Sequence, residues 1–363
     1  MSVCAAEIAR QFTGGTPDTV VPLGSGLIND TFLVTWPGGD LVLQRLNSRV
    51  FPQPALVMDN LAQLNRHAQT KPADQVQLRI PAIIATLSGH PVYRDGDGHY
   101  WRALERIAPA QSRDNMQNAA QARAVGLALA QFHTLCSDLS PDLLHDTLPG
   151  FHITPEYFAE YRQLRPELPA EQADQVRACC AYIESCSDKL DVLEQAKRRG
   201  ELRQRVIHGD PKLNNFLFEP DGDRIVSLID LDTVKPGLIH YDIGDCIRSC
   251  CHDKSVNRFD LPRARLILHS YLQAAGGFLT AADFAYLYPA IWLIPFELGL
   301  RFFTDYLRGN RYFKIEHPEH NLQRSQALFA LCDDIERQKS ALSDCIAAIA
   351  AGLEPAIGHR GVF

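Results

Sequence analysis

The hydrophobic positions of this chain follow two periods, and the change comes near residue 108. Before it, short apolar runs stand between turns made of glycine, proline and aspartate, a pattern that is typical of strands. Residues 57–67 are an exception, since their apolar positions recur at helical spacing. The strand-like runs are residues 41–47, 78–84, 91–93 and 99–104.

Beyond residue 108 the helical period dominates. The chain returns to strand-like runs within residues 206–248, where residues 216–218 and 225–229 flank a turn that contains Pro220 and Gly222. Proline presets the backbone angle and glycine tolerates positive φ, so this stretch predicts a β-hairpin. Helices are predicted at residues 118–136, 157–164, 170–198, 261–275, 281–304 and 321–351.

Together these patterns predict an α+β chain with two lobes. A length of 363 residues exceeds what one typical hydrophobic core supports. We expect a small β-rich N-terminal lobe at residues 1–108 and a larger, mainly helical C-terminal lobe at residues 109–363.

Composition and charge exclude several classes of function. The chain is 46% hydrophobic and 22% charged, as globular proteins are, and its net charge of −7 argues against a nucleic-acid partner. The apolar residues 286–300 include two prolines and Glu297 and fall short of a membrane span. The ten cysteines lack a C-x-x-C pair, and no secretory signal opens the chain. We therefore expect free thiols and a cytoplasmic protein without a membrane partner.

The hairpin carries the candidate chemistry. Asp210 and Asn215 stand at the mouth of its first strand, and Asp230 stands at the end of its second. The hairpin should bring two carboxylates and an amide oxygen around one pocket. Such hard oxygen ligands suit Mg²⁺, and a remaining carboxylate can accept the proton of a substrate hydroxyl. An ordinary hairpin with polar ends is the alternative interpretation.

These residues also carry a family resemblance. His208, Asp210 and Asn215, in the pattern His-x-Asp-x-x-x-x-Asn, followed by Asp230, resemble the catalytic and metal loops of the aminoglycoside phosphotransferase and choline kinase superfamily. That superfamily has a protein-kinase-like bilobal fold. Four stretches look more specifically like the N-acetylhexosamine 1-kinase branch, namely residues 212–215, 229–234, 236–237 and 241–248.

The resemblance implies a set of roles in the C-terminal lobe. Asp210 would act as the base, and Asn215 and Asp230 would hold Mg²⁺. His208 is expected to brace the loop, and Lys212 to neutralise charge on the γ-phosphate. Asp232 would assist the metal or orient its loop. We expect Asp242 and Asp245 to hold backbone N–H groups of the loop instead of contacting ligand.

For the nucleotide, the resemblance points to a glycine loop with Gly24, Gly26, Asn29 and Thr31, although a plain hairpin turn would read the same way. Kinase-like folds carry a lysine on the next strand. Here that place holds Gln44 or Arg45, which strand alternation puts on opposite faces, and the sequence leaves open which one faces the nucleotide. A solvated Arg45 is the alternative, and Asp59 is the candidate partner of that cation. By resemblance alone, Glu105 and Ile107 lie in the hinge that binds adenine.

On the acceptor side, the resemblance suggests His152, Arg301 and Tyr312 as substrate-binding residues, together with Asp210. Each has a structural alternative: a buried role for His152, pairing of Arg301 with Asp305, and packing for Tyr312.

The sequence thus predicts an ATP- and Mg²⁺-dependent kinase that acts as a monomer. Its acceptor would be an N-acetylhexosamine or hexose, phosphorylated at the 1-position. One alternative is a kinase for an amino alcohol, an aminoglycoside or homoserine. Another is an inactive nucleotide-binding scaffold, which the absent strand lysine supports and the intact Asp210, Asn215 and Asp230 oppose.

Overall fold

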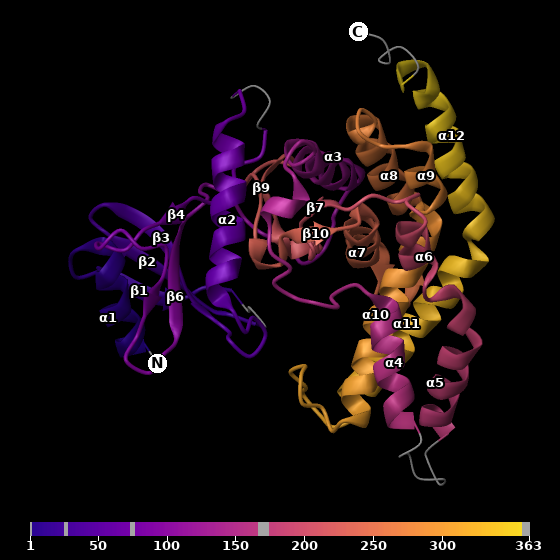
Figure 1. Ribbon diagram of the computed structural model, residues 1–363, viewed down its shortest axis with the longest axis horizontal. Helices are drawn as coiled ribbons and strands as arrows, with labels where there is room; N and C mark the ends of the chain where they lie inside the picture. The colour runs from indigo at the N-terminus through magenta and orange to yellow at the C-terminus, as the bar shows by residue number, and fades with distance from the viewer. Residues whose placement is uncertain (1, 25–27, 73–76, 166–173, 358–363) are drawn as a thin grey trace.

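The computed structural model describes residues 2–24, 28–72, 77–165 and 174–357. The chain forms a small lobe built on a β-sheet and a larger, mainly helical lobe, arranged side by side along the longest axis (Figure 1). This confirms the predicted α+β bilobal architecture. The boundary near residue 108 stays a prediction.

The small lobe is an antiparallel sheet in the order β1-β2-β3-β6-β4, with β5 also paired to β6. Helix α1 packs on one face of it, against Val34, Leu43, Trp101 and their neighbours. Residues of opposite parity on β3 and β6 therefore face away from α1. The elements are α1 (Ser2–Thr13), β1 (Thr19–Pro22), β2 (Asp30–Trp36), β3 (Gly39–Leu46), β4 (Ile83–Ile84), β5 (Tyr93–Arg94) and β6 (Tyr100–Glu105).

Helix α2 (Pro54–Gln69) lies between the sheet and the larger lobe (Figure 1). Its apolar side chains Met58, Leu61 and Leu64 are buried in the main core, which continues into the larger lobe. The Asn60 amide donates to the carbonyl oxygens of His145 and Val234, at 2.8 and 2.9 Å. The predicted helix at residues 57–67 is therefore confirmed, and it connects the two lobes.

In the larger lobe the predicted hairpin is present, with Phe216 of β8 opposite Leu228 of β9. Three predicted helices are in fact broken: α5 and α6 replace residues 170–198, α9 and α10 replace 281–304, and α11 and α12 replace 321–351. The elements are α3 (Ala119–Leu135), α4 (Thr154–Leu164), α5 (Asp174–Ser185), α6 (Val192–Arg198), β7 (Arg205–Ile207), β8 (Phe216–Phe218), β9 (Ile225–Leu228), β10 (Lys235–Gly237), α7 (Ile239–Cys251), β11 (His252–Asp253), β12 (Arg258–Phe259), α8 (Leu261–Ala275), α9 (Ala281–Ala285), α10 (Leu287–Leu307), α11 (His320–Arg337) and α12 (Lys339–Ile357).

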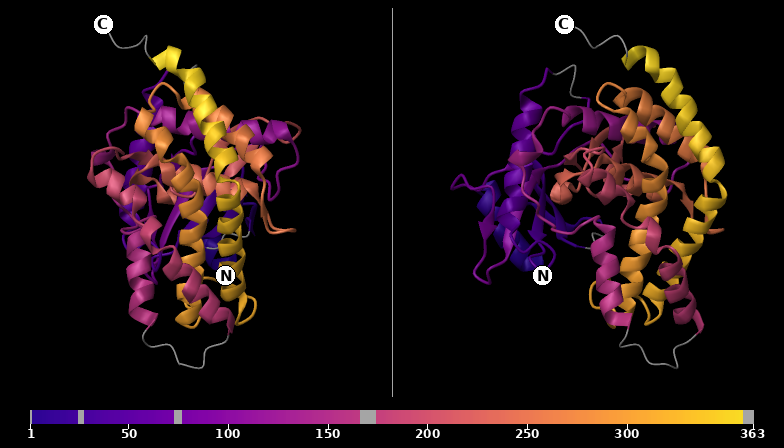
Figure 2. Two further views of the ribbon diagram at one scale, coloured as in Figure 1. Left: turned by 90° about the vertical axis from the view of Figure 1, so that its right-hand side faces the viewer. Right: turned by 45° about the vertical axis from the view of Figure 1, so that its right-hand side comes forward.

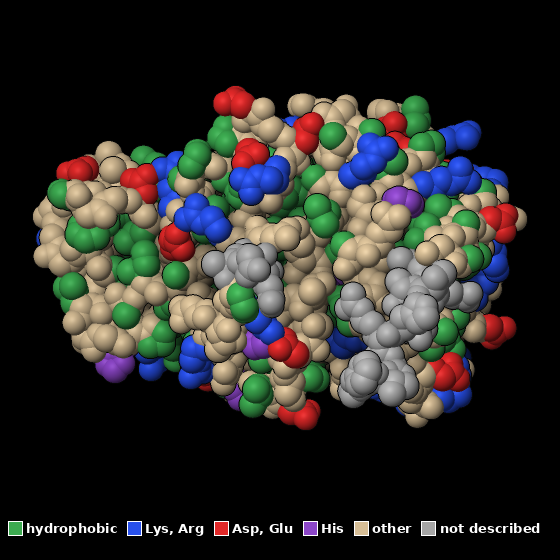
Figure 3. All heavy atoms as spheres, turned by 90° about the horizontal axis from the view of Figure 1, so that it is seen from above, with side chains coloured by type: hydrophobic (Ala, Val, Ile, Leu, Met, Phe, Trp, Pro, Cys, Tyr) green, Lys and Arg blue, Asp and Glu red, His purple; other side chains and the backbone are tan. Residues whose placement is uncertain are grey.

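Helix α12 runs along the outer side of the larger lobe, away from the small lobe (Figure 2). On the face seen in Figure 3, basic and acidic side chains are interspersed. Among the described helices, none combines the length and hydrophobicity that a membrane crossing requires.

Candidate active site

Helix α7 holds the loop that follows β7 and begins at His208. Asp242 of α7 accepts hydrogen bonds from the backbone N–H groups of His208 and Gly209, at 2.7 and 2.8 Å, and from the His133 ring at 2.9 Å. Burial alone would raise the pKa of Asp242, but the hydrogen bonds and charge interactions with His133 and His208 together outweigh it, and the pKa is lowered. The predicted role of Asp242 is therefore confirmed.

Gly209 is required where the loop turns. Its φ is 86°, and a Cβ there would come within 2.6 Å of the Thr233 carbonyl oxygen. The ring of His208 is buried, and its Nδ1 accepts from the Asp210 N–H at 3.3 Å while Nε2 lies 3.0 Å from the Ile229 carbonyl oxygen. Burial lowers the pKa of His208, which favours the neutral ring. These contacts support the predicted bracing role of His208.

Asp210, Asn215 and Asp230 converge as the hairpin predicted. The Asn215 amide donates to the Asp210 carbonyl oxygen at 2.7 Å. The Lys212 ammonium pairs with the Asp210 carboxylate and lies 3.7 Å from Asp230 Oδ2. The Ile229 N–H donates to the Asn215 carbonyl oxygen at 2.9 Å, which connects the end of β9 to the predicted catalytic loop. Both carboxylates are thus within reach of one cation.

Electrostatics suit Asp210 for proton transfer. Burial raises the pKa of Asp210 to about 6, with Asp245 and Asp230 adding to the rise and Lys212 opposing it. A base with a pKa close to neutral is deprotonated at working pH and still accepts a proton readily.

The donors present fit a hard divalent cation. The Asn215 Nδ2 is used by Asp210, which leaves its Oδ1 as an acceptor. Asp230 has φ 65°, its side chain is 40% exposed, and its one ionic contact among the described residues is Lys212. Amide and carboxylate oxygens such as these are ligands that Mg²⁺ takes in phosphoryl-transfer sites.

Asp245 differs from its predicted role. Its Oδ1 accepts from the Arg248 guanidinium at 2.8 Å, and its Oδ2 is buried without a partner in the described part of the chain. Asp245 therefore holds no backbone N–H group of the described residues, so the prediction is wrong for Asp245, although it is confirmed for Asp242.

The predicted nucleotide loop reaches the larger lobe. The Asn29 amide donates to Asp232 Oδ2 at 2.7 Å, and Thr31 Oγ1 accepts from Gln44 at 3.0 Å. Gly24 has φ 70°, as a tight turn allows, while Gly26 lies outside the described residues. Contact of this loop with phosphate stays a prediction.

The two residues that could occupy the place of the strand lysine, Gln44 and Arg45, point in opposite directions. Arg45 lies on the face that α1 covers and pairs with Asp30 of the neighbouring strand. Gln44 lies on the face toward the larger lobe, opposite Arg102 of β6. Asp59 is exposed, and among the described residues its ionic contact is with His145, whose Nε2 lies 3.9 Å from Asp59 Oδ2. This geometry argues against Arg45 as the cation of the nucleotide site and against Asp59 as its partner.

The predicted hinge begins at Glu105, the last residue of β6, and continues beyond it. The Glu105 carboxylate pairs with Arg79, and its N–H donates to the Ala82 carbonyl oxygen. Ile107 is buried, and its backbone groups make no hydrogen bond to another described backbone group. A hinge that binds an adenine edge requires such free groups, so the assignment of Glu105 and Ile107 stays open as a prediction.

His152 follows its structural alternative. It is buried, Nδ1 lies 3.0 Å from Glu297, and Nε2 lies 2.8 Å from the Gly209 carbonyl oxygen. Burial would lower the pKa of His152, but Glu297 reverses this and raises it. With both nitrogens engaged, His152 supports the catalytic loop, which argues against the predicted contact with substrate.

Arg301 is held by aromatic rings. Its guanidinium carbon lies 5.3, 5.1 and 5.6 Å from the ring centroids of Phe151, Tyr157 and Phe313. Within the described residues it makes no hydrogen bond or ion pair. The alternative partner Asp305 instead accepts backbone N–H groups, including that of Tyr312 at 2.8 Å, and the Tyr312 side chain is 55% exposed. Contact of Arg301 and Tyr312 with substrate stays a prediction.

A comparison of families decides the class of protein. The sequence profile of the phosphotransferase enzyme family (APH) matches residues 19–280, well over half of the chain. The chain belongs to this family.

This phosphotransferase is similar to individual relatives and solved structures over most of its length. It is 26% identical to a homoserine kinase of Sinorhizobium fredii over 301 residues, which cover 81% of this chain and 80% of that protein. A microcompartment-associated aminopropanol kinase is 16% identical, with a TM-score of 0.65 over 94% of this chain and 98% of that one. An amicoumacin kinase in complex with AMP-PNP and Ca²⁺ is 15% identical, with a TM-score of 0.60 over 92% of each chain.

Sequence reasoning missed one buried cation of this phosphotransferase. Arg102 is 1% exposed and contacts Gln44 and Asp232. Its position opposite Gln44 follows from the pairing of β3 with β6, which no local pattern reveals. The missed His133 and Thr154 support Asp242 and Glu297 in the same indirect way.

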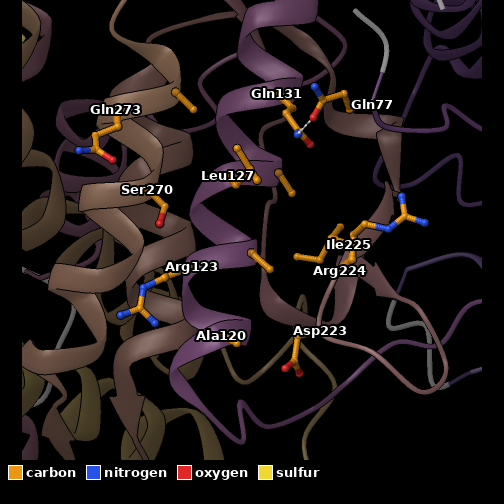
Figure 4. A pocket seen from close by; sticks show the side chains of 13 residues that line it. Gln77, Ala120, Arg123, Leu127, Gln131, Asp223, Arg224, Ile225, Ser270 and Gln273 are labelled. Atoms are coloured by element: carbon orange, nitrogen blue, oxygen red, sulfur yellow. Dashed lines mark hydrogen bonds between the residues drawn. The ribbon is translucent and has the colours of Figure 1, made fainter. Parts of the chain in front are cut away.

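A hollow of about 650 Å³ lies elsewhere on the phosphotransferase, beside α3 (Figure 4). Leu127 of α3 and Ile225 of β9 line it, and Gln77 is hydrogen-bonded to Gln131 at its rim. None of the candidate site residues is among its lining residues, so we do not connect it with phosphoryl transfer.

Proposed function

We propose that this phosphotransferase transfers the γ-phosphoryl group of ATP to a hydroxyl group of a small sugar. The observation that carries the proposal is the meeting of Asp210, Asn215 and Asp230 around Lys212, in a chain of the phosphotransferase enzyme family. A positioned base, oxygen ligands for a metal and a cation are what phosphoryl transfer requires.

In this proposal each residue has one task. Asp210 accepts the proton of the acceptor hydroxyl through its carboxylate, and the loop contacts of Asp242 and His208 fix its position. Lys212, now paired with Asp210, turns toward the negative charge of the transferred group. Asn215 Oδ1 and the Asp230 carboxylate would hold Mg²⁺, which would neutralise charge on the phosphates.

The acceptor side favours an oxygen-rich substrate over a cationic one. Arg301 is a half-buried cation without a carboxylate partner among the described residues. The nearby Glu297 is already engaged by His152 and Thr154. A guanidinium offers five donors to hydroxyl or acetamide oxygens but repels an ammonium group. This supports a sugar over an amino alcohol or an aminoglycoside.

The choice of an N-acetylhexosamine or hexose, with transfer to the 1-position, rests on the resemblance of residues 212–215, 229–234, 236–237 and 241–248 to that branch. Homoserine is the second candidate. It is favoured by the 26% identical homoserine kinase, and its carboxylate would pair with Arg301, although Arg301 would repel its ammonium group.

The test is ATP consumption by the purified protein over a panel of hexoses, N-acetylhexosamines, homoserine and amino alcohols. We expect turnover with a sugar, and phosphorus NMR of the product then locates the phosphorylated hydroxyl. Asp210→Asn should abolish transfer while MgATP affinity, measured by calorimetry, stays near the wild-type value. Turnover with homoserine alone would replace the sugar, and absence of MgATP binding would overturn the proposal entirely.

A further inference from the structure

The face of the small-lobe sheet toward the larger lobe carries a buried ion pair between the lobes. Arg102 of β6 and Asp232, which follows β9, are each 3% exposed or less. They are paired although they stand 130 residues apart in the chain. We propose that Arg102 is a positioning residue for metal binding: it holds Asp232, and through it the loop that carries Asp230, against the small lobe. This inference rests on the function proposed above.

The contacts of Arg102 leave its side chain little freedom. Its Nε and Nη2 donate to Gln44 Oε1 at 3.0 and 2.7 Å, and Nη2 also pairs with Asp232. Gln44 is in turn fixed by its own bond to Thr31 Oγ1 at 3.0 Å. Nη1 has the Met58 sulfur at 3.8 Å, a weak acceptor. The guanidinium therefore has one orientation, which is directed at Asp232.

Asp232 connects the predicted glycine loop with the turn that follows Asp230. Its Oδ1 pairs with Arg102 and its Oδ2 accepts from Asn29 of the predicted glycine loop. It lies in the short 3₁₀ turn Leu231–Thr233 that begins directly after Asp230, so the two residues move together. A shift of Asp232 would move the nearby Asp230 relative to Asn215, whose backbone carbonyl oxygen accepts from the Ile229 N–H. Arg102 therefore acts on the metal through this turn.

The type of residue matters at this position. A buried ion pair contributes more to a specific arrangement than to net stability, and removal of one partner leaves a buried charge uncompensated. Arginine reaches Gln44 and Asp232 together through its planar fork, which a lysine ammonium does not reproduce. The pair also provides a cation on the face toward the larger lobe, where Gln44 stands in place of the strand lysine of kinase-like folds.

The readout is the ratio of MgATP affinity to metal-free ATP affinity, measured by calorimetry without acceptor. Substitution of residues that orient metal ligands costs about 10–100-fold in metal affinity. In Arg102→Met we expect the ratio to fall by about that factor, with metal-free ATP affinity nearly unchanged. In Arg102→Lys the ratio should lie between those of Arg102→Met and the wild type. The matched control is Arg94→Met, which removes an exposed arginine from the adjacent strand β5 and should keep the wild-type ratio.

A folding defect is separated by a second variant. Arg102→Met with Asp232→Asn removes both charges, so it should melt closer to the wild type than Arg102→Met alone and still show the reduced ratio. An unchanged ratio in this double variant would overturn the inference, as would an equal loss of MgATP and metal-free ATP affinity. The inference would also be overturned if the ratio fell in Arg45→Met while Arg102→Met kept the wild-type ratio. A wild-type protein that does not bind MgATP would overturn the proposed function itself.

Discussion

The support of the catalytic loop by Asp242 gives the sharpest prediction of stability and activity together. Asp242 is fully buried and accepts three hydrogen bonds, from the N–H groups of His208 and Gly209 and from the ring of His133. In Asp242→Asn a single oxygen remains. If it stays toward His208 and His133, the new amide group faces the Gly209 N–H, donor against donor.

The magnitude follows from that count. One buried backbone donor without a partner costs about 1–3 kcal/mol. The two remaining bonds lose their charge assistance, which makes a bond roughly twice as strong. We expect a loss of about 2–4 kcal/mol in the free energy of unfolding. The freed loop also misplaces Asp210, and a shift of about 1 Å can cost about 100-fold in kcat.

The assay is urea unfolding together with kcat at saturating ATP and acceptor, well below the unfolding midpoint. The matched control is Asp334→Asn in α11. Asp334 is also buried and accepts a backbone N–H, from Phe259 at 2.8 Å, but it touches no candidate site residue. It should lose stability and keep kcat. The reasoning would be refuted if Asp242→Asn kept the wild-type kcat, or if Asp334→Asn lost as much kcat as Asp242→Asn.

Three further predictions concern the site itself. Since the Asp210 carboxyl has a pKa of about 6 and must be deprotonated to accept a proton, kcat/KM for the acceptor should fall as the pH drops below about 6; a rate profile flat to about pH 5 would contradict this role. Asp230→Ala should weaken MgATP binding and spare metal-free ATP, and undiminished MgATP affinity in calorimetry would remove Asp230 from the metal site. Arg301→Gln should raise KM for the acceptor about tenfold or more, because a charged donor is lost, and leave KM for ATP unchanged; an unchanged acceptor KM would exclude Arg301 from the acceptor site.

The parts of the site that the sequence predicts are local ones. Asn215 follows Asp210 by five residues, and the turn between β8 and β9 brings Asp230 back to them, so spacing and turn chemistry were sufficient. The same holds for the alternation of Gln44 and Arg45. Which of the two faces the larger lobe depends on where α1 packs, and that is a tertiary choice. Arg102 joins Gln44 through strand pairing across 58 residues, a register that one sequence does not disclose.

The predicted acceptor residues also show that tertiary contacts cannot be predicted from local sequence. His152 and Arg301 both carry polar groups that a sequence motif can place near a substrate, yet their surroundings separate them. His152 is used twice inside the protein, by Glu297 and by the Gly209 carbonyl oxygen. Arg301 meets aromatic faces, which stabilise a cation without using its hydrogen-bond donors. Burial and the number of partners, which only the structure gives, indicate that His152 supports the loop of Asp210. They leave the hydrogen-bond donors of Arg301 available for a substrate.

Among the described residues, the contacts that hold the loop of the predicted base Asp210 come from the larger lobe. Asp242 holds two N–H groups of the loop, and His152 and Thr233 hold the carbonyl oxygens of Gly209 and His208, the latter at 2.8 Å. The metal loop is different, because Asp232 draws its two side-chain contacts from the small lobe. Motion of the small lobe would therefore disturb metal and nucleotide before it disturbs the base. This division explains why variants at Asp242 should lower kcat, whereas variants at Arg102 should act first on MgATP affinity.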